Sequence, residues 1–392
     1  MKYYIIAGEA SGDLHGSNLM KGIYRKDPDA VIRFWGGDMM LNVWKENSNK
    51  GGLVQHYKKS AVMGFVEVLA MADRLLHNLR FCKNDIIDFN PDCVILIDYP
   101  GFNFRIAEFA HKHGYKVFYY IAPKVWASRE GRNRKLRRDV DKLYIIFPFE
   151  IPYFESKGIP YIYRGNPLVD AVDDSAAMSE SREDFLRRND LEDKKIIAML
   201  AGSRKSEIST MMPVLVNFAQ KMHGIAGYEN YQFLIAGAPS RSIDDYSKYI
   251  PEGCSSYIKV LFSQTQSIVR QAEAAVVNSG TASLETVLLG TPQVVGFIMG
   301  SRLTYLIAKH IVKVKYISLG NLIVNKLAFK EFIQDDCNPD ALVTEVSSLI
   351  EDKAYRNRML NDYAEIRERL GGSGASDAVA ASMIEELNNS VD

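Results

Sequence analysis

The segment Asn278-Ser279-Gly280-Thr281-Ala282-Ser283-Leu284-Glu285 has a pattern around which the rest of the chain can be organised. Residues 274–277 before it form an apolar run, and Leu284, Val287 and Leu288 recur behind it at helical spacing. Gly290 can end that helix, and residues 292–297 indicate a further strand. The pattern predicts a buried strand, a turn of small residues and a helix, which together are the repeating unit of a parallel α/β sheet.

This turn has the features of a nucleotide site. Small residues let a ligand approach the backbone, and a helix start offers free N–H groups and a partial positive charge to a phosphate. Glu285 lies just over one helical turn further on, where a carboxylate can accept hydrogen bonds from two ribose hydroxyls. We therefore predict a donor site formed by Ser279, Gly280, Thr281 and Glu285. The alternative is an ordinary strand–turn–helix unit without a ligand.

The composition is that of a globular protein large enough for two domains. The chain has 392 residues, of which 47% are apolar and 24% charged, and its formal net charge is zero. A neutral chain creates no global field for nucleic acid, so we expect no nucleic-acid partner. The four cysteines show no paired spacing, which argues against a disulfide framework or a zinc site. With no membrane-length apolar run and a first strand in place of a signal peptide, we expect a cytoplasmic protein.

Two turns in the first half follow predicted strands. Residues 3–7 precede Gly8-Glu9-Ala10-Ser11-Gly12-Asp13, which does not match the dinucleotide fingerprint. Acidic side chains there would repel a phosphate, so we expect a sugar or another hydroxyl-rich group beside Glu9, Ser11 and Gly12. The alternative is a capped helix start, with Ser11 or Asp13 as the cap.

The second turn follows the apolar run of residues 92–97 and reads Asp98-Tyr99-Pro100-Gly101-Phe102-Asn103. In an open parallel sheet, ligands bind beyond the carboxyl ends of the strands. Asp98 is then placed to act as a general base, and Asn103 to position a substrate. Alternatively, one of the two merely caps the helix that follows.

Two further segments suggest contact with lipid. The helix predicted from residue 61 to 79 is apolar on more than one face, which usually means burial; alternatively Met63, Phe65 and Val66 contact acyl chains or a bilayer. A run of basic residues near Trp126 is usually a solvated surface, but it can also bind an anionic membrane. We call this run the basic cluster; its members are Arg129, Arg132, Arg134, Lys135, Arg137 and Arg138.

The strand–helix alternation restarts after a polar linker near residues 173–183. We predict strands at residues 3–7, 31–35, 92–97, 117–121 and 143–147, and again at 196–200, 233–236, 257–261, 274–277 and 293–297. Two such series form two Rossmann-like, doubly wound α/β domains facing across a cleft, at residues 1–170 and 171–392. The last helices would pack back on the N-terminal domain or on a partner subunit.

The first strand of the second series ends at a turn containing Gly202, Ser203 and Arg204. Arg204 brings a permanent cation whose planar fork matches a diphosphate, so we add these residues to the donor site. An ordinary exposed arginine is the alternative.

Taken together, these segments resemble the lipid-A-disaccharide synthase family of lipid glycosyltransferases, whose fold is the two-domain GT-B type. The resemblance runs from residue 8 to about residue 339. It rests on Met63-Gly64-Phe65-Val66-Glu67-Val68-Leu69, Ile97-Asp98-Tyr99-Pro100-Gly101-Phe102-Asn103, Pro123-Lys124-Val125-Trp126-Ala127, Phe147-Pro148-Phe149-Glu150, Gly202-Ser203-Arg204, the segment from Ser279 to Glu285, and Tyr316-Ile317-Ser318-Leu319-Gly320-Asn321-Leu322. Asn166 stands where the family commonly has His, and it is left out of the predicted site.

The resemblance implies an inverting hexosyltransferase of lipid A biosynthesis. UDP-2,3-diacylglucosamine would donate its sugar to the 6-hydroxyl of 2,3-diacylglucosamine 1-phosphate, giving a β-1,6 disaccharide and UDP. Asp98 would take the acceptor proton, Arg204 and the two glycine turns would stabilise the diphosphate, Glu285 would hold the ribose, and Asn321 would lie near the donor. No cofactor or metal is expected, and the D-x-D spacings at Asp27/Asp29 and Asp139/Asp141 are interpreted as surface charge.

The same resemblance implies a peripheral enzyme on an anionic inner-membrane surface, and it leaves a homodimer open. Two rivals remain. A UDP-sugar 2-epimerase shares the fold and the nucleotide site but needs no lipid surface, and a nucleotide-binding regulator needs no base at Asp98. The apolar helix and the basic cluster favour the lipid enzyme over the epimerase.

Overall fold

The computed structural model describes residues 1–60, 68–127, 130–278, 280–301, 305 and 315–389. Met63, Phe65, Val66, Arg129 and Ser279, which carry part of the predictions above, lie outside the described residues. The chain forms two compact units. Unit 1 comprises Met1–Ala171 with Gly371–Asp392, and unit 2 comprises Val172–Leu370.

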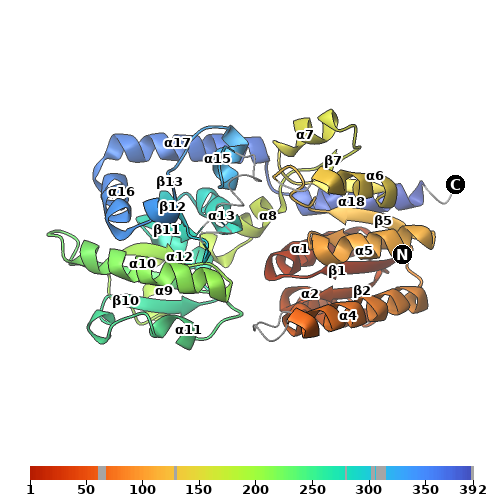
Figure 1. The fold of residues 1–392 in the computed structure, drawn as a ribbon, viewed down its shortest axis with the longest axis horizontal. Coiled ribbons are helices and arrows are strands. Elements are labelled where there is room, and N and C mark those ends of the chain that lie inside the picture. Colours follow the sequence, from red (N-terminus) through yellow and green to blue (C-terminus); the bar gives the residue numbers. More distant parts are fainter. Residues whose placement is uncertain (61–67, 128–129, 279, 302–304, 306–314, 390–392) are drawn as a thin grey trace. The chain divides into compact units, whose positions relative to one another are not determined.

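Unit 1 is built on a parallel sheet whose strand order is β3-β2-β1-β4-β5-β6-β7 (Figure 1). Its strands, rich in β-branched and aromatic residues, are almost wholly buried; every residue of β4 is fully buried, as expected for a parallel sheet covered on both faces. The chain leaves β1 in one direction and β4 in the other, so the switch point lies between these two strands. The strands are β1 (Lys2–Ala7), β2 (Val31–Gly36), β3 (Gly51–His56), β4 (Cys93–Ile97), β5 (Lys116–Tyr120), β6 (Lys142–Ile145) and β7 (Ile162–Tyr163).

Helices cover both faces of this sheet. One face carries α1 (Ala10–Lys26), α2 (Asp38–Asn47) and the C-terminal helix α18 (Ala375–Asn388); the other carries α4 (Val68–Phe89), α5 (Pro100–Lys112) and α6 (Asn133–Asp139). Helix α18 packs closely on α1, and Asp170 caps it by accepting hydrogen bonds from the backbone N–H groups of Gly374 (2.6 Å) and Ser376 (2.7 Å). Shorter helices are α3 (Tyr57–Ser60), α7 (Glu150–Ser156) and α8 (Pro167–Asp173).

Unit 2 repeats the topology with the strand order β10-β9-β8-β11-β12-β13, so its switch point lies between β8 and β11. The strands are β8 (Lys195–Leu200), β9 (Tyr231–Gly237), β10 (Ile258–Phe262), β11 (Ala274–Asn278), β12 (Gln293–Phe297) and β13 (Glu331–Ile333). Helices α10 (Lys205–His223) and α16 (Pro339–Glu351) pack on one face, and α12 (Thr265–Gln271) and α13 (Thr281–Leu289) on the other. The remaining helices include α9 (Arg182–Arg188), α11 (Asp244–Ser247), α15 (Leu319–Val324) and α17 (Lys353–Leu370).

The prediction of two doubly wound α/β domains is confirmed, and each predicted strand overlaps an observed one. Strands β3, β7 and β13 were not predicted. The segment predicted to be the linker contains the end of α8, a short 3₁₀ turn at Ala176–Met178 and the start of α9.

Candidate active site

The two turns at the switch point of unit 1 lie side by side. Strands β1 and β4 are parallel neighbours with Ala7 opposite Ile97, so the residues that follow them meet at one edge of the sheet. A Cβ atom added to Gly8 would lie only 2.4 Å from the ring of Tyr99. Glycine is therefore required at position 8, and the turn bearing Glu9 lies directly beside the turn bearing Asp98.

The backbone of Asp98 is held in an unusual conformation. Asp98 (φ 43°) and Tyr99 (φ 46°) both lie in the left-handed region, which costs energy for residues with a side chain. The Asp98 carbonyl accepts hydrogen bonds from the Tyr119 hydroxyl (2.6 Å) and from Asn103 Nδ2 (2.8 Å), and the Asp98 N–H donates to the Tyr120 carbonyl (3.1 Å). We call these three bonds the Asp98 clamp. They offset the backbone strain and hold the main chain of Asp98, from which the carboxylate side chain extends.

Asn103 is fully buried, and its amide nitrogen also donates to the Ile97 carbonyl at 3.2 Å. In this structure it therefore acts on the backbone of Asp98, and its direct contact with an acceptor stays a prediction. Tyr119 was missed by the sequence analysis. It is fully buried at the end of β5, and its pKa is raised by burial and further by the charge of Asp98. The strand register could have identified it, because Tyr119 pairs with Leu96 on β4, only two residues before Asp98.

The acidic turn after β1 divides into exposed and buried parts. Glu9 and Ser11 are exposed, while Gly12 is buried, and a Cβ atom added to it would lie 3.2 Å from the Ala7 side chain. Asp13 is buried and accepts hydrogen bonds from the N–H groups of α2, including Gly37 at 2.7 Å and Met40 at 3.1 Å. Asp13 thus caps the neighbouring helix. The alternative that Ser11 or Asp13 caps its own helix is wrong, because Glu9 occupies the N-cap position of α1.

The switch point of unit 2 joins the two predicted phosphate turns. Strands β8 and β11 are parallel neighbours with Leu200 opposite Val277, and Asn278 Nδ2 donates to the Ala201 carbonyl at 3.2 Å. Gly202 has φ 103°, and a Cβ there would lie 2.7 Å from Asn278 Nδ2. The turns of Gly202 and Gly280 are therefore next to each other, as a diphosphate site on this sheet requires.

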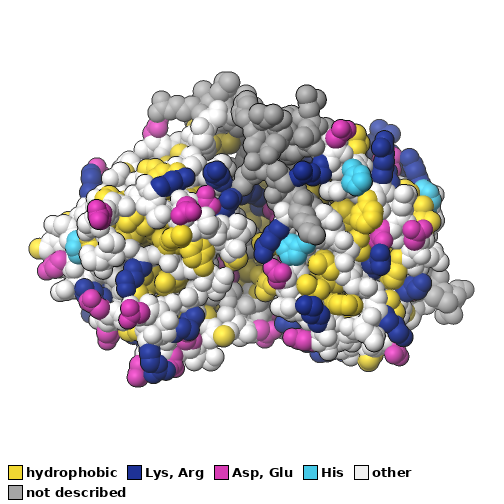
Figure 2. Space-filling model, turned by 90° about the horizontal axis from the view of Figure 1, so that it is seen from below, with side chains coloured by type: hydrophobic (Ala, Val, Ile, Leu, Met, Phe, Trp, Pro, Cys, Tyr) yellow, Lys and Arg dark blue, Asp and Glu magenta, His cyan; other side chains and the backbone are white. Residues whose placement is uncertain are grey.

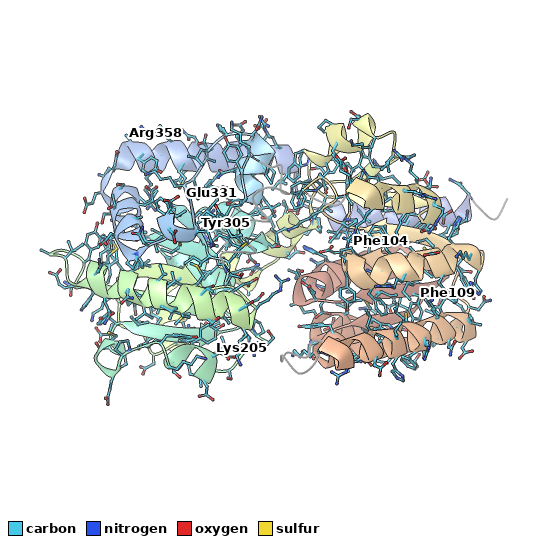
Figure 3. All side chains as sticks on the ribbon, viewed as in Figure 1. Phe104, Phe109, Lys205, Tyr305, Glu331 and Arg358 are labelled. Atoms are coloured by element: carbon cyan, nitrogen blue, oxygen red, sulfur yellow. The ribbon has the colours of Figure 1, made fainter. Side chains whose placement is uncertain are left out.

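Glu207, which the sequence analysis also missed, occupies the start of α10. Its Oε2 accepts hydrogen bonds from the N–H groups of Ser203 (2.9 Å) and Arg204 (3.1 Å), and its Oε1 accepts one from Arg204 Nη1 (3.0 Å). Lys205, the first residue of the helix, lies next to this group (Figure 3). A phosphate that used these donors would have to displace Glu207 from them.

Glu285 is paired with a second polar side chain that the sequence did not single out. Gln266 Nε2 donates to Glu285 Oε1 at 2.6 Å; burial raises the pKa of Glu285, and this hydrogen bond lowers it. Gln266 also lines a pocket of about 590 Å³, whose other lining residues include Pro239, Ser263 and Gln264.

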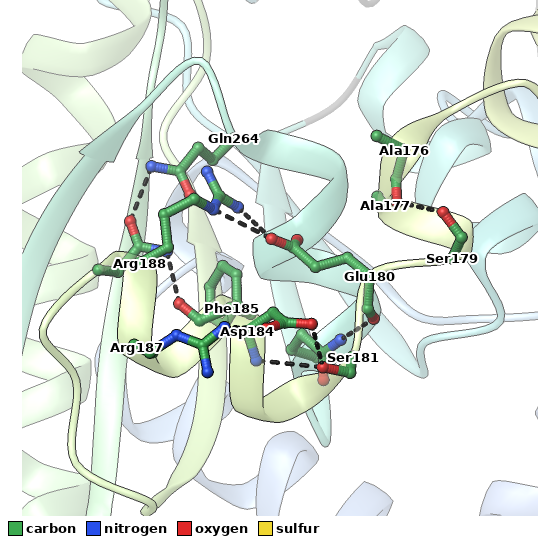
Figure 4. Close-up of polar contacts among 12 residues, drawn as sticks. Ala176, Ala177, Ser179, Glu180, Ser181, Asp184, Phe185, Arg187, Arg188 and Gln264 are labelled. Atoms are coloured by element: carbon green, nitrogen blue, oxygen red, sulfur yellow. Dashed lines mark hydrogen bonds and ion pairs between the residues drawn. The ribbon is translucent and has the colours of Figure 1, made fainter.

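One wall of that pocket is an ion pair, and we call the cavity the Gln266 pocket. Arg188 lies against Glu180 (Figure 4), with its Nε 3.0 Å and its Nη2 2.6 Å from Glu180 Oε1. Beside them, Gln264 Nε2 donates to Asn189 Oδ1 at 2.8 Å. The side-chain oxygen of Gln264, Oε1, is buried and has no hydrogen-bond partner among the described residues. The pocket thus has a wall of polar side chains held by hydrogen bonds to one another.

Asn321 is fully buried at the start of α15. Its Nδ2 donates to the Phe329 carbonyl (3.0 Å) and to Oε1 of Glu331 (2.8 Å), and its Oδ1 accepts a bond from the Ala328 N–H (2.9 Å). These contacts shape the loop that leads into β13. A contact between Asn321 and the donor stays a prediction.

Several members of the basic cluster are already engaged with other groups of the protein. Arg138 pairs with Asp139 at 2.6 Å and lies 3.5 Å from Glu108, so its charge is compensated locally. Arg132 lies over the ring of Phe104 (Figure 3) at 5.6 Å, and Arg137 donates to a backbone carbonyl. Arg134, Lys135, Arg137 and Arg138 are exposed, and Lys135 Nζ also lies over the Phe104 ring at 5.9 Å.

Three observations bear on the predicted membrane contact. On the face drawn in Figure 2, Lys and Arg side chains are interspersed with Asp and Glu, so positive charge is not gathered there. Among the helices of the described residues, none is both long enough and apolar enough to cross a bilayer. The exposed apolar side chains of α4 in the described part of the chain are Leu76, Phe81 and Ile87.

Comparison with known proteins identifies the family. The family model described as lipid-A-disaccharide synthetase matches residues 3–382. The lipid-A-disaccharide synthase of Trichlorobacter lovleyi is 35% identical over 385 residues, covering 97% of each chain, and that of Geobacter sulfurreducens is 34% identical over 389 residues, covering 99% of this chain and 97% of the relative. Among solved structures, the UDP-GlcNAc 2-epimerase of Methanocaldococcus jannaschii in complex with UDP-GlcNAc and UDP has a TM-score of 0.65 at 14% identity, covering 98% of this chain and 100% of that one. The epimerase of Neisseria meningitidis bound to UDP-GlcNAc has a TM-score of 0.62 at 14% identity, covering 98% and 100%.

Proposed function

The chain belongs to the lipid-A-disaccharide synthase family, a family of hexosyltransferases of lipid A biosynthesis, and from that premise we propose how its residues carry out the reaction. The family uses a sugar-nucleotide donor and a lipid acceptor. The likeness to the epimerases, at 14% identity, is one of fold alone, so that alternative is not favoured. The observation that carries the proposal is the clamped Asp98 at the switch point of unit 1.

We assign the acceptor chemistry to unit 1. Asp98 would accept the proton of the 6-hydroxyl of a 2,3-diacylglucosamine 1-phosphate as that oxygen attacks the anomeric carbon of the donor. Glu9 and Ser11, exposed on the adjoining turn, would hydrogen-bond the acceptor sugar. Tyr119 and Asn103 would act through the backbone of Asp98, keeping its carboxylate within reach of the hydroxyl.

We assign the donor to unit 2. The diphosphate of a UDP-diacylglucosamine would lie against the turns of Gly202 and Gly280, with Arg204 stabilising the charge that develops as UDP leaves. This requires Arg204 to exchange Glu207 for the phosphates, since Glu207 holds it at 3.0 Å. Glu285 would bind the ribose, and the Gln266 pocket, which adjoins Glu285 through a 2.6 Å hydrogen bond, has room for the uracil base.

A release assay tests the assignment. Wild-type protein given acylated donor and acceptor should produce UDP and disaccharide 1-phosphate in equal amounts. Donor alone should yield neither UDP nor a 2-epimer. Epimer formed from UDP-GlcNAc, with no disaccharide from the acylated pair, would establish the epimerase instead, and nucleotide binding without either product would leave a regulator.

The site of action is the second part of the proposal. Substrates with several acyl chains stay in a bilayer, because each buried methylene contributes about 0.8 kcal/mol. The protein would therefore bind the anionic inner-membrane surface from the cytoplasm, through the basic cluster and the segment containing Met63, Phe65 and Val66. A homodimer is compatible with this attachment.

Arg134 and Lys135, for which the described part of the chain gives no ion pair, provide a matched test of membrane binding against Arg138, which has one. Replacing Arg134 and Lys135 by Gln should reduce co-sedimentation with anionic vesicles at low salt, by about 1 kcal/mol for each charge near the surface. Arg138→Gln is the control, because Arg138 already pairs with Asp139 and should contribute less. If Arg138→Gln weakens binding as much as either of the other substitutions, the cluster acts only through net charge. If all three substituted proteins pellet like wild type, the membrane contact lies elsewhere.

A further inference from the structure

Glu150 is a buried carboxylate for which the assignments above have no use. It is the first residue of α7, and 1% of it is exposed. Its Oε1 accepts a hydrogen bond from the indole of Trp126 (3.1 Å), and its Oε2 accepts bonds from the N–H groups of Ile146 (3.2 Å) and Phe147 (3.0 Å). One carboxylate thus ties the loop after β5 to the turn after β6.

The residues it ties together carry aromatic rings. Trp126 lies edge-on against Phe149 with ring centres 4.9 Å apart, and Phe149 stacks on Phe147 at 5.2 Å with nearly parallel planes. Phe147 is buried, whereas Trp126 and Phe149 are partly exposed. The two exposed rings form an apolar surface that we call the aromatic wall.

The aromatic wall belongs to the same edge of the sheet as Asp98. Strand β5 pairs with β4 on one side and with β6 on the other, all parallel, so the loops after them emerge at one edge. The backbone links them directly. The Asp98 N–H donates to the Tyr120 carbonyl, and the Ile121 N–H donates to the Tyr144 carbonyl, each at 3.1 Å. An acceptor whose hydroxyl meets Asp98 is therefore within reach of the loop that carries Trp126.

We propose that Glu150 is a positioning residue for the acceptor, orienting the indole of Trp126 so that the aromatic wall packs against the apolar face of the acceptor sugar beside Asp98. Binding sites for such ligands combine aromatic walls with a few fixed polar groups. The inference rests on the proposed function, because that function supplies the sugar acceptor.

The charge of Glu150 makes this contact sensitive to pH. Burial raises the pKa of Glu150 to about 7, while its hydrogen bonds and the nearby Lys124 lower it. On the other side, the negative charge of Glu150 helps burial to raise the pKa of Tyr163 to about 12. The ionised carboxylate accepts all three N–H bonds. When Glu150 is protonated near neutral pH, one of its oxygens carries a hydrogen, which opposes an N–H donor placed against that oxygen. The hold on Trp126 should therefore weaken as the pH falls below about 7.

The decisive substitution is Glu150→Gln. A glutamine has one acceptor oxygen; if that oxygen serves Ile146 and Phe147, the amide NH₂ faces the indole N–H, and the bond to Trp126 is lost selectively. We expect KM for the acceptor to rise about tenfold, the size of one hydrogen bond to a charged group, with kcat and donor KM changed less than about twofold. Glu155→Gln, on the same helix but exposed, is the matched control and should change none of these constants.

A double-mutant cycle separates positioning from a purely structural role. Trp126→Phe removes the indole donor, so Glu150→Gln added to it should raise acceptor KM no more than about twofold. An equal loss in both backgrounds, or an equal rise in donor and acceptor KM, would overturn the proposal. Glu150→Ala should match Glu150→Gln only if the cavity it leaves does not unfold α7, which circular dichroism reports.

A spectroscopic arm is independent of activity. The indole N–H resonance of Trp126, identified by its absence in Trp126→Phe, should shift with a midpoint near pH 7 in wild type and stay flat in Glu150→Gln. A flat wild-type resonance would end the proposal. A titrating resonance together with no disaccharide synthesis would instead indicate that the proposed function, and not the Glu150–Trp126 contact, is wrong.

Discussion

The two switch points of this protein share one topology and differ in chemistry. In unit 1, the turns after β1 and β4 present the carboxylates of Glu9 and Asp98. In unit 2, the corresponding turns after β8 and β11 present Gly202, Gly280 and the guanidinium of Arg204. The strand order sets where a ligand lies, and the residues at the strand ends decide whether the place suits a hydroxyl that must lose a proton or a phosphate that must be neutralised.

The two units also differ in how the turns at their switch points reach a positive φ. Unit 2 uses glycines at positive φ, 103° at Gly202 and 145° at Gly280, which carry no penalty from a Cβ atom. Unit 1 places Asp98 at φ 43°, where glycine would be less strained, and offsets the strain with the Asp98 clamp. A strained residue that keeps its side chain indicates that the carboxylate itself is needed there.

Removing that carboxylate should have the largest effect. Asp98→Asn retains the shape but cannot accept the acceptor proton, so kcat should fall by about 10²- to 10⁴-fold, the usual contribution of a general base. UDP affinity, measured calorimetrically, should stay within about twofold because the donor site belongs to unit 2. A variant that keeps a third of wild-type turnover would show that Asp98 is not the base.

The donor turns can be separated by nucleotide length. Arg204→Ala should weaken UDP binding by about 10- to 100-fold, as expected for hydrogen bonds to a charged group, and weaken UMP binding less because UMP has one phosphate. Glu285→Ala should weaken UDP and UMP binding equally, since both carry the ribose. Equal losses for the two nucleotides in Arg204→Ala would mean that Arg204 does not bind the diphosphate.

The Asp98 clamp predicts a smaller effect at a distance from the substrates. Tyr119→Phe removes the 2.6 Å bond to the Asp98 carbonyl and should lower kcat about five- to tenfold, with donor KM unchanged. Tyr120→Phe is the matched control: it is the next residue of β5 and equally buried, but only its backbone contacts Asp98. If the two variants lose the same activity, the Tyr119 hydroxyl serves the core and does not position Asp98.

These contrasts show which features the sequence could predict. Buried parallel strands carry continuous apolar runs, so β4 and β11 were evident, whereas β3 begins Gly51-Gly52 and lies at an edge, where no such run is needed. The conformation at Asp98 was not predictable. A residue before proline is biased towards extended backbone, yet Tyr99 before Pro100 is left-handed. The preceding residue, Asp98, is also left-handed, and its backbone is held by long-range bonds to Tyr119 and Tyr120 that the local sequence does not reveal.

The predicted donor site shows the same limit. Gly202 and Arg204 could be proposed from the sequence because a small residue and a cation directly follow a predicted strand. The partners Glu207 and Gln266 were missed, since a glutamate inside a helix and a glutamine after a strand are common on any surface. Their roles depend on distances of 2.9 Å to Ser203 and 2.6 Å to Glu285 that only the folded chain provides.

The smallest predicted effect concerns stability and separates the two units by pH. His15, buried on α1 of unit 1, has its pKa lowered by burial to about 4, although the charge of Asp170 raises it. The unfolded chain therefore takes up a proton first, and the stability that neutral His15 contributes above pH 6.5 is lost as the pH falls towards 4. From pH 7 to 5.5 this amounts to about 1 kcal/mol.

The tryptophans make this loss measurable in unit 1 alone, because Trp35, Trp44 and Trp126 all lie within Met1–Ala171. The unfolding free energy of wild type relative to His15→Gln, followed by tryptophan fluorescence in denaturant, should fall by about 1 kcal/mol between pH 7 and 5.5. Taking the difference between two proteins cancels the opposite slope from Glu150, whose raised pKa makes the folded state gain stability on acidification. Glu285→Gln, in unit 2, should leave the fluorescence transition unchanged. A pH-independent difference between wild type and His15→Gln would mean that His15 has the same pKa in the folded and the unfolded chain, so that its burial does not disfavour the charged form.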